Sequence, residues 1–216
     1  MKRRGYLLDF AGTLRDDLKP VYLGTRDVFA RFGRKPPSFA EYRRTISSDY
    51  WLFYRKSGFG DEERPEVDRL FNEIFFERYA SRAVLFPDVL STITELKRRG
   101  RSVGIVSNLR RSLLQQHIME DGLENMVDAI VSREDTDRHK PYPEPILAGF
   151  SKLGLSPSDG SYTGDEISDI EASRSAGAFS IAISRKGSHH TRKMLESVKP
   201  DLVIGSLTGL LDFDSG

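Results

Sequence analysis

Short apolar runs that end in polar or turn residues recur along the chain. The first run, residues 5–10 (GYLLDF), is almost unbroken and is followed by the turn residues Gly12 and Thr13. An apolar run of this length is typical of a strand that is covered on both faces of a parallel sheet. Runs of the same kind lie at 102–106, 129–131, 162–163, 179–183 and 202–204. The sequence therefore predicts a set of buried parallel strands.

Stretches with helical spacing separate these runs. Val89, Leu90, Ile93 and Leu96, for example, place apolar side chains on one helix face ahead of Gly100. Strands that alternate with helices form repeated strand–helix units. We therefore predict an α/β fold with a Rossmann-like parallel sheet flanked by helices.

The segment between the first two runs differs, because it has helical periodicity and no convincing strand. One apolar helix face is made by Val67, Leu70, Phe71, Ile74 and Phe75. Glycines and prolines at 33–37 and 58–65 break the segment into several helices. We predict an α/β core domain at 1–16 and 83–216, interrupted by a small all-helical domain at 17–82.

Composition narrows the class of protein. With 216 residues the chain is long enough for one main core with an addition. The formal net charge of +1 gives no global field for nucleic acid or an anionic membrane. The cysteine count of zero excludes thiolate metal sites and cysteine nucleophiles. No apolar run approaches the roughly 20 residues of a membrane span, so we expect a cytoplasmic protein without a membrane or nucleic-acid partner. The oligomeric state is left open.

Polar residues gather where the predicted strands end, which in an open parallel sheet is the edge where ligands bind. They are Asp9, Gly12 and Thr13 after the first run, Ser107 and Asn108 after the second, Lys140 ahead of a helix, and Asp165 and Asp169 after the run at 162–163. An aspartate can attack phosphorus and form an acyl phosphate. Two or more carboxylates and a main-chain carbonyl suit Mg²⁺. A hydroxyl and an ammonium can hold the phosphoryl oxygens. The pattern predicts phosphoryl transfer from a small phosphorylated molecule.

In type and order these residues resemble the four motifs of the haloacid dehalogenase superfamily. The first motif corresponds to residues 9–14, and the others to Ser107, to Lys140, and to Asp165 with Asp169. The helical segment also occupies the position of that family's cap domain. The resemblance spans nearly the whole chain and implies a magnesium-dependent hydrolase of the phosphatase type, such as a phosphoglycolate phosphatase.

The resemblance also implies roles for individual residues. Asp9 would be the nucleophile and a magnesium ligand, and Lys140 would pair with both the phosphate and Asp9. Asp165 would ligate the metal, and Asp169 would support it directly or through water. The main-chain carbonyl of Ala11 would complete the set of metal ligands. Ser107, Asn108, Gly12 and Thr13 would contact the substrate.

Ala11 departs from the pattern, because phosphatases of the superfamily carry there a second aspartate that protonates the leaving group. General acid–base catalysis is typically worth about 10²- to 10⁴-fold. The change leaves three hypotheses open: a slowed phosphatase, a carbon–phosphorus hydrolase, or a phosphate-binding protein with negligible turnover. The second resembles the phosphonoacetaldehyde hydrolases, which have an alanine at this position and a lysine in the cap that forms a Schiff base.

Lysines and histidines supply candidates for the missing chemistry. Lys56 is the first candidate for a Schiff-base lysine, although a solvated helix lysine is the simpler interpretation. His139 is a candidate proton shuttle because an imidazole titrates near neutral pH. His189 and His190 precede Arg192 and Lys193, and we expect them to lie in a solvated basic helix start.

Overall fold

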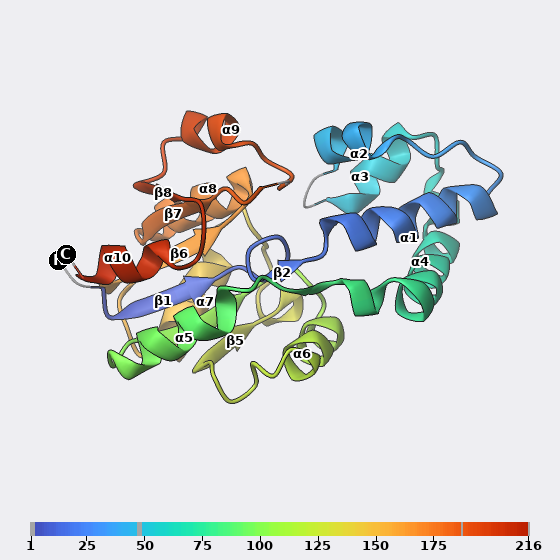
Figure 1. The fold of residues 1–216 in the computed structure, drawn as a ribbon. Helices are drawn as coiled ribbons and strands as arrows, with labels where there is room; N and C mark the ends of the chain where they lie inside the picture. The colour runs from blue at the N-terminus through green and yellow to red at the C-terminus, as the bar shows by residue number, and fades with distance from the viewer. Residues whose placement is uncertain (1–2, 47–48, 187, 216) are drawn as a thin grey trace. The chain divides into compact units, whose positions relative to one another are not determined.

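The computed structural model describes residues 3–46, 49–186 and 188–215. The chain divides into two compact units, Met1–Arg15 with Leu85–Gly216, and Asp16–Val84 (Figure 1). Two short strands, β2 (Arg15–Asp16) and β3 (Val84–Leu85), lie at the boundaries and pair with each other. Within the described residues, none of the helices is both long and apolar enough to span a membrane.

The first unit is built on a six-stranded parallel sheet with the order β5-β4-β1-β6-β7-β8. The strands are β1 (Gly5–Leu8), β4 (Ser102–Val106), β5 (Ala129–Val131), β6 (Gly160–Gly164), β7 (Phe179–Ile183) and β8 (Leu202–Ile204). Leu8, the last residue of β1, pairs with Ile105 of β4 and with Thr163 of β6. The predicted α/β fold with a parallel sheet is confirmed.

Only β6 is clearly longer than its apolar run at 162–163. It begins at Gly160, where a side chain would require its neighbours to shift: a Cβ there would lie 2.2 Å from the Phe150 ring and 2.8 Å from the Gly5 carbonyl oxygen. Because β6 starts with the small residues Gly160 and Ser161, its first half lacks the apolar run from which a buried strand is predicted.

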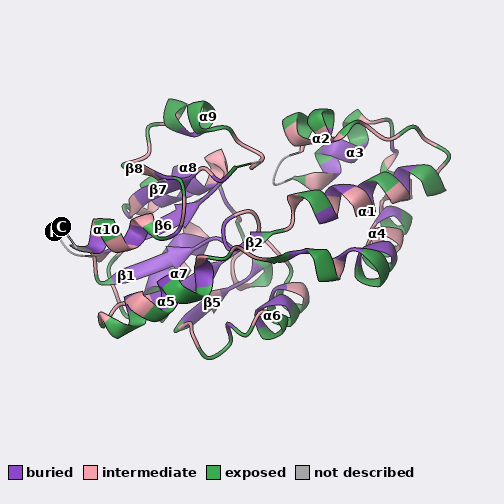
Figure 2. Cartoon of the chain, in the orientation of Figure 1, coloured by how far each residue is buried: buried purple, intermediate pink, exposed green. Residues whose placement is uncertain are grey.

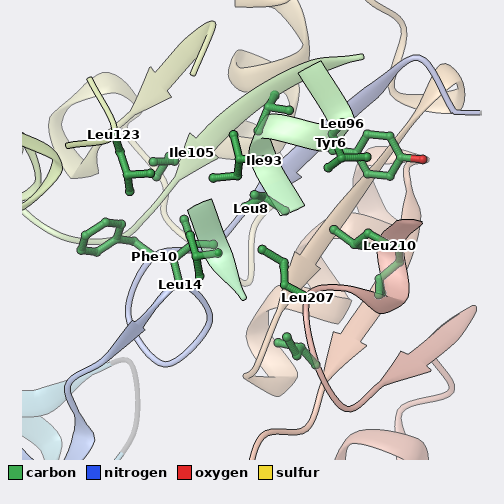
Figure 3. Close-up of a cluster of buried hydrophobic side chains, with 14 of the residues drawn as sticks. Tyr6, Leu8, Phe10, Leu14, Ile93, Leu96, Ile105, Leu123, Leu207 and Leu210 are labelled. Carbon is green, nitrogen blue, oxygen red and sulfur yellow. The ribbon is translucent and has the colours of Figure 1, made fainter. Parts of the chain in front are cut away.

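Helices cover both faces of the sheet. One face carries α5 (Val89–Arg98), α6 (Arg111–Glu120) and α10 (Gly209–Ser215), and the other carries α7 (Glu144–Lys152), α8 (Ile167–Ala176) and α9 (Arg192–Ser197). Short 3₁₀ helices are η3 (Arg133–Asp135) and η4 (Pro157–Asp159). Side chains of β1 alternate between the faces: Tyr6 and Leu8 join the cluster shown in Figure 3, and Leu7 joins the opposite one. Strands β1, β4, β5, β6 and β7 consist largely of buried residues, whereas in the edge strand β8 only Ile204 is buried (Figure 2).

The C-terminal helix α10 is anchored at the amino-terminal end of the sheet. Its buried Asp214 accepts a hydrogen bond of 2.9 Å from the Tyr6 hydroxyl and forms ion pairs with Arg101 at 2.8 Å and Arg99 at 3.4 Å. A buried carboxylate is stable only with such partners. The anchor therefore joins α10 to the first strand of the sheet.

The second unit is helical. Its helices are α1 (Leu18–Arg31), α2 (Phe39–Thr45), α3 (Tyr50–Lys56), η1 (Asp61–Glu63), α4 (Arg64–Arg78) and η2 (Ala80–Arg82). Its core is rich in aromatic rings, among them Phe29, Tyr42 and Trp51. The expected apolar face of α4 is buried at Val67, Ile74 and Phe75. Lys56 is exposed at the end of α3.

Candidate active site

Asp9 lies at the centre of the carboxyl edge of the sheet. It follows β1, which is flanked by β4 on one side and β6 on the other. Its main-chain N–H donates to the Thr163 carbonyl at 2.8 Å, so the residue continues the pairing of β1 with β6. The side chain is buried, with 6% of the residue exposed. The sheet itself therefore fixes the position of the proposed nucleophile.

Two further carboxylates join Asp9. Asp165 directly follows β6, and Asp169 lies in the first turn of α8. One carboxylate oxygen from each of the three residues lies within 4.8 Å of the others, and all three residues are buried. Asp169 is held in place because its Oδ2 accepts the Glu166 N–H at 2.9 Å. The three acids named from the sequence thus form one cluster.

Lys140 is the cation of this cluster. Its Nζ donates to Asp9 Oδ1 at 2.6 Å, to Asp169 Oδ1 at 2.6 Å and to the Tyr162 hydroxyl at 2.8 Å. Asn108 holds the lysine loop: its Oδ1 accepts the Lys140 N–H at 3.2 Å, and its Nδ2 donates to the Lys140 carbonyl at 3.3 Å. Lys140 is therefore fixed by its main chain and by all three protons of its ammonium group.

Sequence reasoning missed Tyr162. Its ring is fully buried in the core, and its hydroxyl lies 3.0 Å from the Val106 carbonyl and 3.2 Å from Asp169 Oδ1. Because that hydroxyl accepts from Lys140, its own proton is available to Val106. A tyrosine inside a buried strand carries one signal that reasoning could have used: a buried hydroxyl needs a partner.

Gly12 and Thr13 form a turn that lies against the Asp165 carboxylate. The Thr13 hydroxyl donates to Asp165 Oδ1 at 3.0 Å. Gly12 has φ +72°, and a Cβ at this position would lie 2.4 Å from Asp165 Oδ2. Only glycine allows the main chain to approach the carboxylate so closely in this conformation.

Ser107 follows β4, the neighbour of β1, and is buried. Its hydroxyl accepts the Leu109 N–H at 3.3 Å, and its own N–H donates to the Val131 carbonyl at 3.0 Å. These bonds fix the start of the loop at the same edge of the sheet as Asp9. The substrate-binding roles of Ser107, Asn108, Gly12 and Thr13 remain predictions.

The charges of the cluster are unbalanced. Burial raises the pKa of Asp9 to about 7, with Lys140 opposing the rise and Asp169 adding to it. Burial, followed by the charges of Asp9 and Asp169, raises the pKa of Asp165 well above its usual value. Burial acts to lower the pKa of Lys140, but Asp169 and Asp9 outweigh it and raise that pKa. Burial and the mutual repulsion of the carboxylates thus raise the pKa values of Asp9 and Asp165, while the attraction of Asp9 and Asp169 for the ammonium group raises that of Lys140.

A divalent cation fits this arrangement. When all three carboxylates are ionised, they and one ammonium group leave two negative charges, which one divalent ion would balance. Carboxylate oxygens are also the ligands that Mg²⁺ and similar hard cations prefer. Asp9, Asp165 and Asp169 are therefore the described residues suited to hold a metal.

Three other positions bear on proton transfer. Ala11 is half-buried and forms an isolated bridge with Arg15. The charges acting on His139 are Arg133 and Glu134, so its ring faces a different set of groups from Lys140, its neighbour in the chain.

The expectation that His190 lies in a solvated helix start is wrong. Helix α9 begins at Arg192, and the half-buried His190 ring lies within hydrogen-bonding reach of the Asp165 main chain. The physical reason is that the loop after β7 begins at the same sheet edge as Asp165.

Comparison with known proteins supports the sequence resemblance. Residues 6–183 match the family model described as haloacid dehalogenase-like hydrolase. Phosphoglycolate phosphatase 1 of Pseudomonas aeruginosa is 27% identical over 213 residues, which is 95% of this chain and 77% of that protein. Pyrophosphatase PpaX of Bacillus velezensis is 27% identical over 210 residues, which is 95% of this chain and 93% of that protein.

Solved structures show the same fold. A predicted phosphoglycolate phosphatase from Haemophilus somnus superposes with a TM-score of 0.88 at 19% identity, over 99% of this chain and 98% of that one. A haloacid dehalogenase-like family hydrolase from Streptococcus pneumoniae superposes with a TM-score of 0.81 at 16% identity, over 98% of both chains. At these sequence identities, the structural matches establish the fold alone.

Proposed function

The chain belongs to the haloacid dehalogenase-like hydrolase family, and on that premise we propose that it hydrolyses a small phosphorylated metabolite with Asp9 as nucleophile. The observation that carries the proposal is the buried cluster of Asp9, Asp165 and Asp169 around Lys140 at the carboxyl edge of the sheet. A buried surplus of negative charge is costly unless a ligand compensates it. A metal ion together with a phosphoryl group is the ligand that this set of side chains suits.

The proposed reaction has two steps. A carboxylate oxygen of Asp9 attacks phosphorus, the bond to the leaving group breaks, and the leaving group takes the electron pair. Water then attacks the phosphorylated Asp9 and releases phosphate and the free carboxylate. Splitting the reaction in this way replaces one difficult displacement with two easier ones.

The chain's own residues position and stabilise the reacting groups. Lys140 holds the Asp9 carboxylate at 2.6 Å and would bring a positive charge to the phosphoryl oxygens. The Ser107 hydroxyl would add a donor to those oxygens. The turn at Gly12 and Thr13 would contact the substrate, although the Gly12 N–H and the Thr13 hydroxyl already donate to Arg15 and Asp165. We propose Mg²⁺ as the cation at Asp9, Asp165 and Asp169; when bound, it would lower the repulsion between the attacking carboxylate and the phosphate.

Ala11 has no acidic proton to give to a leaving group, which limits the leaving groups that the site can expel quickly. Lys140 and Thr13 already donate their protons to carboxylates, and the Tyr162 hydroxyl has the Val106 carbonyl as its acceptor. A leaving group that departs without a proton is therefore favoured, and we expect an alkyl phosphate such as phosphoglycolate to react slowly. Phosphoglycolate and pyrophosphate, the substrates named by the two relatives, are the first compounds to test. We propose that residues 17–82 act as a cap that limits access of water, and that the protein works in the cytoplasm.

Ala11 also favours a second candidate, cleavage of a carbon–phosphorus bond. That reaction needs a lysine that forms a Schiff base, and such lysines are activated by burial or by neighbouring cations. Lys56 is exposed at the end of α3, which weighs against it in this role. Hydrolysis of phosphate compounds therefore remains the leading proposal.

A substrate screen tests the proposal. Purified protein with Mg²⁺ is assayed for phosphate release from phosphoglycolate, pyrophosphate, p-nitrophenyl phosphate and phosphonoacetaldehyde, beside an Asp9→Asn variant. We expect turnover of at least one phosphate compound by the wild type and none by the variant. Equal release by both proteins would indicate contamination and refute the proposal. Release from phosphonoacetaldehyde alone would favour the second candidate.

A further inference from the structure

Arg185 is a buried cation with no part in the reaction described above. It lies two residues after β7, and only 7% of its side chain is exposed. Arginine is rarely buried this far unless its charge and its hydrogen-bond donors are matched. Its surroundings therefore indicate what it does.

The guanidinium group binds two partners and stacks on a third. Its Nε donates to the Thr13 carbonyl at 3.0 Å. On its other side, Nη1 donates to Asp88 Oδ2 at 3.1 Å, and Nη2 lies 3.0 Å from Asp88 Oδ1. The plane lies over the Phe86 ring, 3.8 Å from its centre. The rigid fork of arginine permits these contacts at once, and lysine could not reproduce them.

Asp88 shows that the pairing is specific. It occupies the N-cap position of α5, where an aspartate usually accepts a helix N–H, but its side chain makes no such bond. Instead Oδ2 accepts from Arg185 and from the Leu207 N–H at 2.6 Å. The carboxylate thus gives up a capping role and joins Arg185 to a second loop.

The Thr13 carbonyl connects Arg185 to the acidic cluster. The hydroxyl of the same Thr13 donates to Asp165 Oδ1 at 3.0 Å. The neighbouring Gly12 lies so close that a Cβ on it would meet Asp165 Oδ2 at 2.4 Å. One face of the Asp165 carboxylate is therefore defined by a turn whose main chain is held by Arg185.

We infer that Arg185 is a positioning residue, which acts through Thr13 to orient Asp165 for a divalent cation. The inference rests on the function proposed above, because it takes Asp165 to be a metal ligand. Groups that orient a metal ligand typically change metal affinity by about 10- to 100-fold when they are removed.

Binding of Mn²⁺ alone tests this inference without any substrate. The dissociation constant is measured by the electron paramagnetic resonance signal of free Mn²⁺, for the wild type, Arg185→Met, Thr13→Val and the double variant. We expect each single variant to bind Mn²⁺ at least tenfold more weakly. Because both changes break the same connection, the double variant should bind about as weakly as the weaker single variant.

A matched control separates positioning from loss of stability. Arg101→Met also removes a partner from a buried acid, Asp214, but at the opposite end of the sheet. It should lower the melting temperature and leave the Mn²⁺ affinity within twofold of the wild type. If Arg185→Met does not fold, Arg185→Met with Asp88→Asn removes both charges of the pair, and the same tenfold loss is expected.

The outcomes are distinguishable. If folded Arg185→Met binds Mn²⁺ with an affinity within twofold of the wild type, the inference is overturned and the proposed function is left intact. The inference would also be overturned if the factors by which Arg185→Met and Thr13→Val raise the Mn²⁺ dissociation constant multiply in the double variant. A wild type that does not bind Mn²⁺ would overturn both the inference and the metal-dependent function.

Discussion

Replacing Ala11 with aspartate should restore a proton donor to the site. Ala11 stands two residues after Asp9 and is only half-buried, so a larger side chain can be accommodated there. The donors nearest to the nucleophile in the described core are already engaged: Lys140 binds Asp9, Asp169 and Tyr162. Burial acts to lower the pKa of Lys140, but the neighbouring carboxylates outweigh it and raise that pKa. Lys140 is therefore a poor acid at neutral pH. The introduced carboxyl would lie beside the same carboxylates, which favour its protonated form.

The size of the effect follows from the chemistry of the leaving group. A positioned general acid is typically worth about 10²- to 10⁴-fold, which corresponds to roughly 3 to 5 kcal/mol of barrier. An alkyl leaving group, as in phosphoglycolate, needs the proton and should gain tenfold or more. The p-nitrophenolate leaving group is stable without a proton and should gain less.

The assay is kcat/KM for phosphoglycolate and p-nitrophenyl phosphate, measured for the wild type and Ala11→Asp. Ala11→Asn serves as a control of nearly the same size that supplies no acidic proton. An unchanged or lower rate on phosphoglycolate, in a folded variant that still binds Mg²⁺, would refute the view that this is a phosphatase slowed by a missing acid. Carbon–phosphorus cleavage or phosphate binding would then be the better hypothesis.

Three further results are expected. Asp9→Asn should lose turnover by roughly 10³-fold or more, because an amide cannot attack phosphorus usefully; an unchanged rate and melting temperature would mean that Asp9 only caps a turn. EDTA should abolish hydrolysis, and Mg²⁺ should restore it, since a cation would balance the charges of the acidic cluster; full activity in metal-free buffer would argue against a metal site. Tyr162→Phe should lower the free energy of unfolding by about 1–3 kcal/mol, measured in urea, because its hydroxyl binds Lys140 and the Val106 carbonyl; a loss below about 0.5 kcal/mol would show that the hydroxyl is not a required partner.

The fold and the acidic cluster were predictable because their signals are local. Apolar runs mark the strands, and a parallel sheet brings the residues after those strands to one edge. Asp9 and Asp165 were found in this way, Asp169 from its place four residues after Asp165, and Lys140 from its place ahead of a helix. The structure places these residues in contact or within 4.8 Å.

The supporting residues were not predictable, because their meaning depends on contacts between distant segments. Arg185 belongs to a polar stretch after β7 that reads as solvated loop, and its burial results from Asp88 and Thr13, far away in the chain. Tyr162 lies within an apolar run, so the sequence indicates only that its buried hydroxyl needs a partner and does not identify Lys140 as that partner. His190 was misread for the same reason, since adjacency to basic residues in sequence does not report the fold of the loop.

The order of strands in the sheet has a consequence for synthesis on the ribosome. Strand β1 is made before both of its neighbours, because Gly5 pairs with Ser102 on one side and Gly160 on the other. At about 5–20 residues per second, the apolar β1 waits roughly 5 to 20 s for β4 and longer for β6. The helical unit Asp16–Val84 is contiguous and is complete before β4 is made. In a nascent chain, β1 should therefore stay an unpaired apolar strand after the whole helical unit has been made, which exposes it to aggregation.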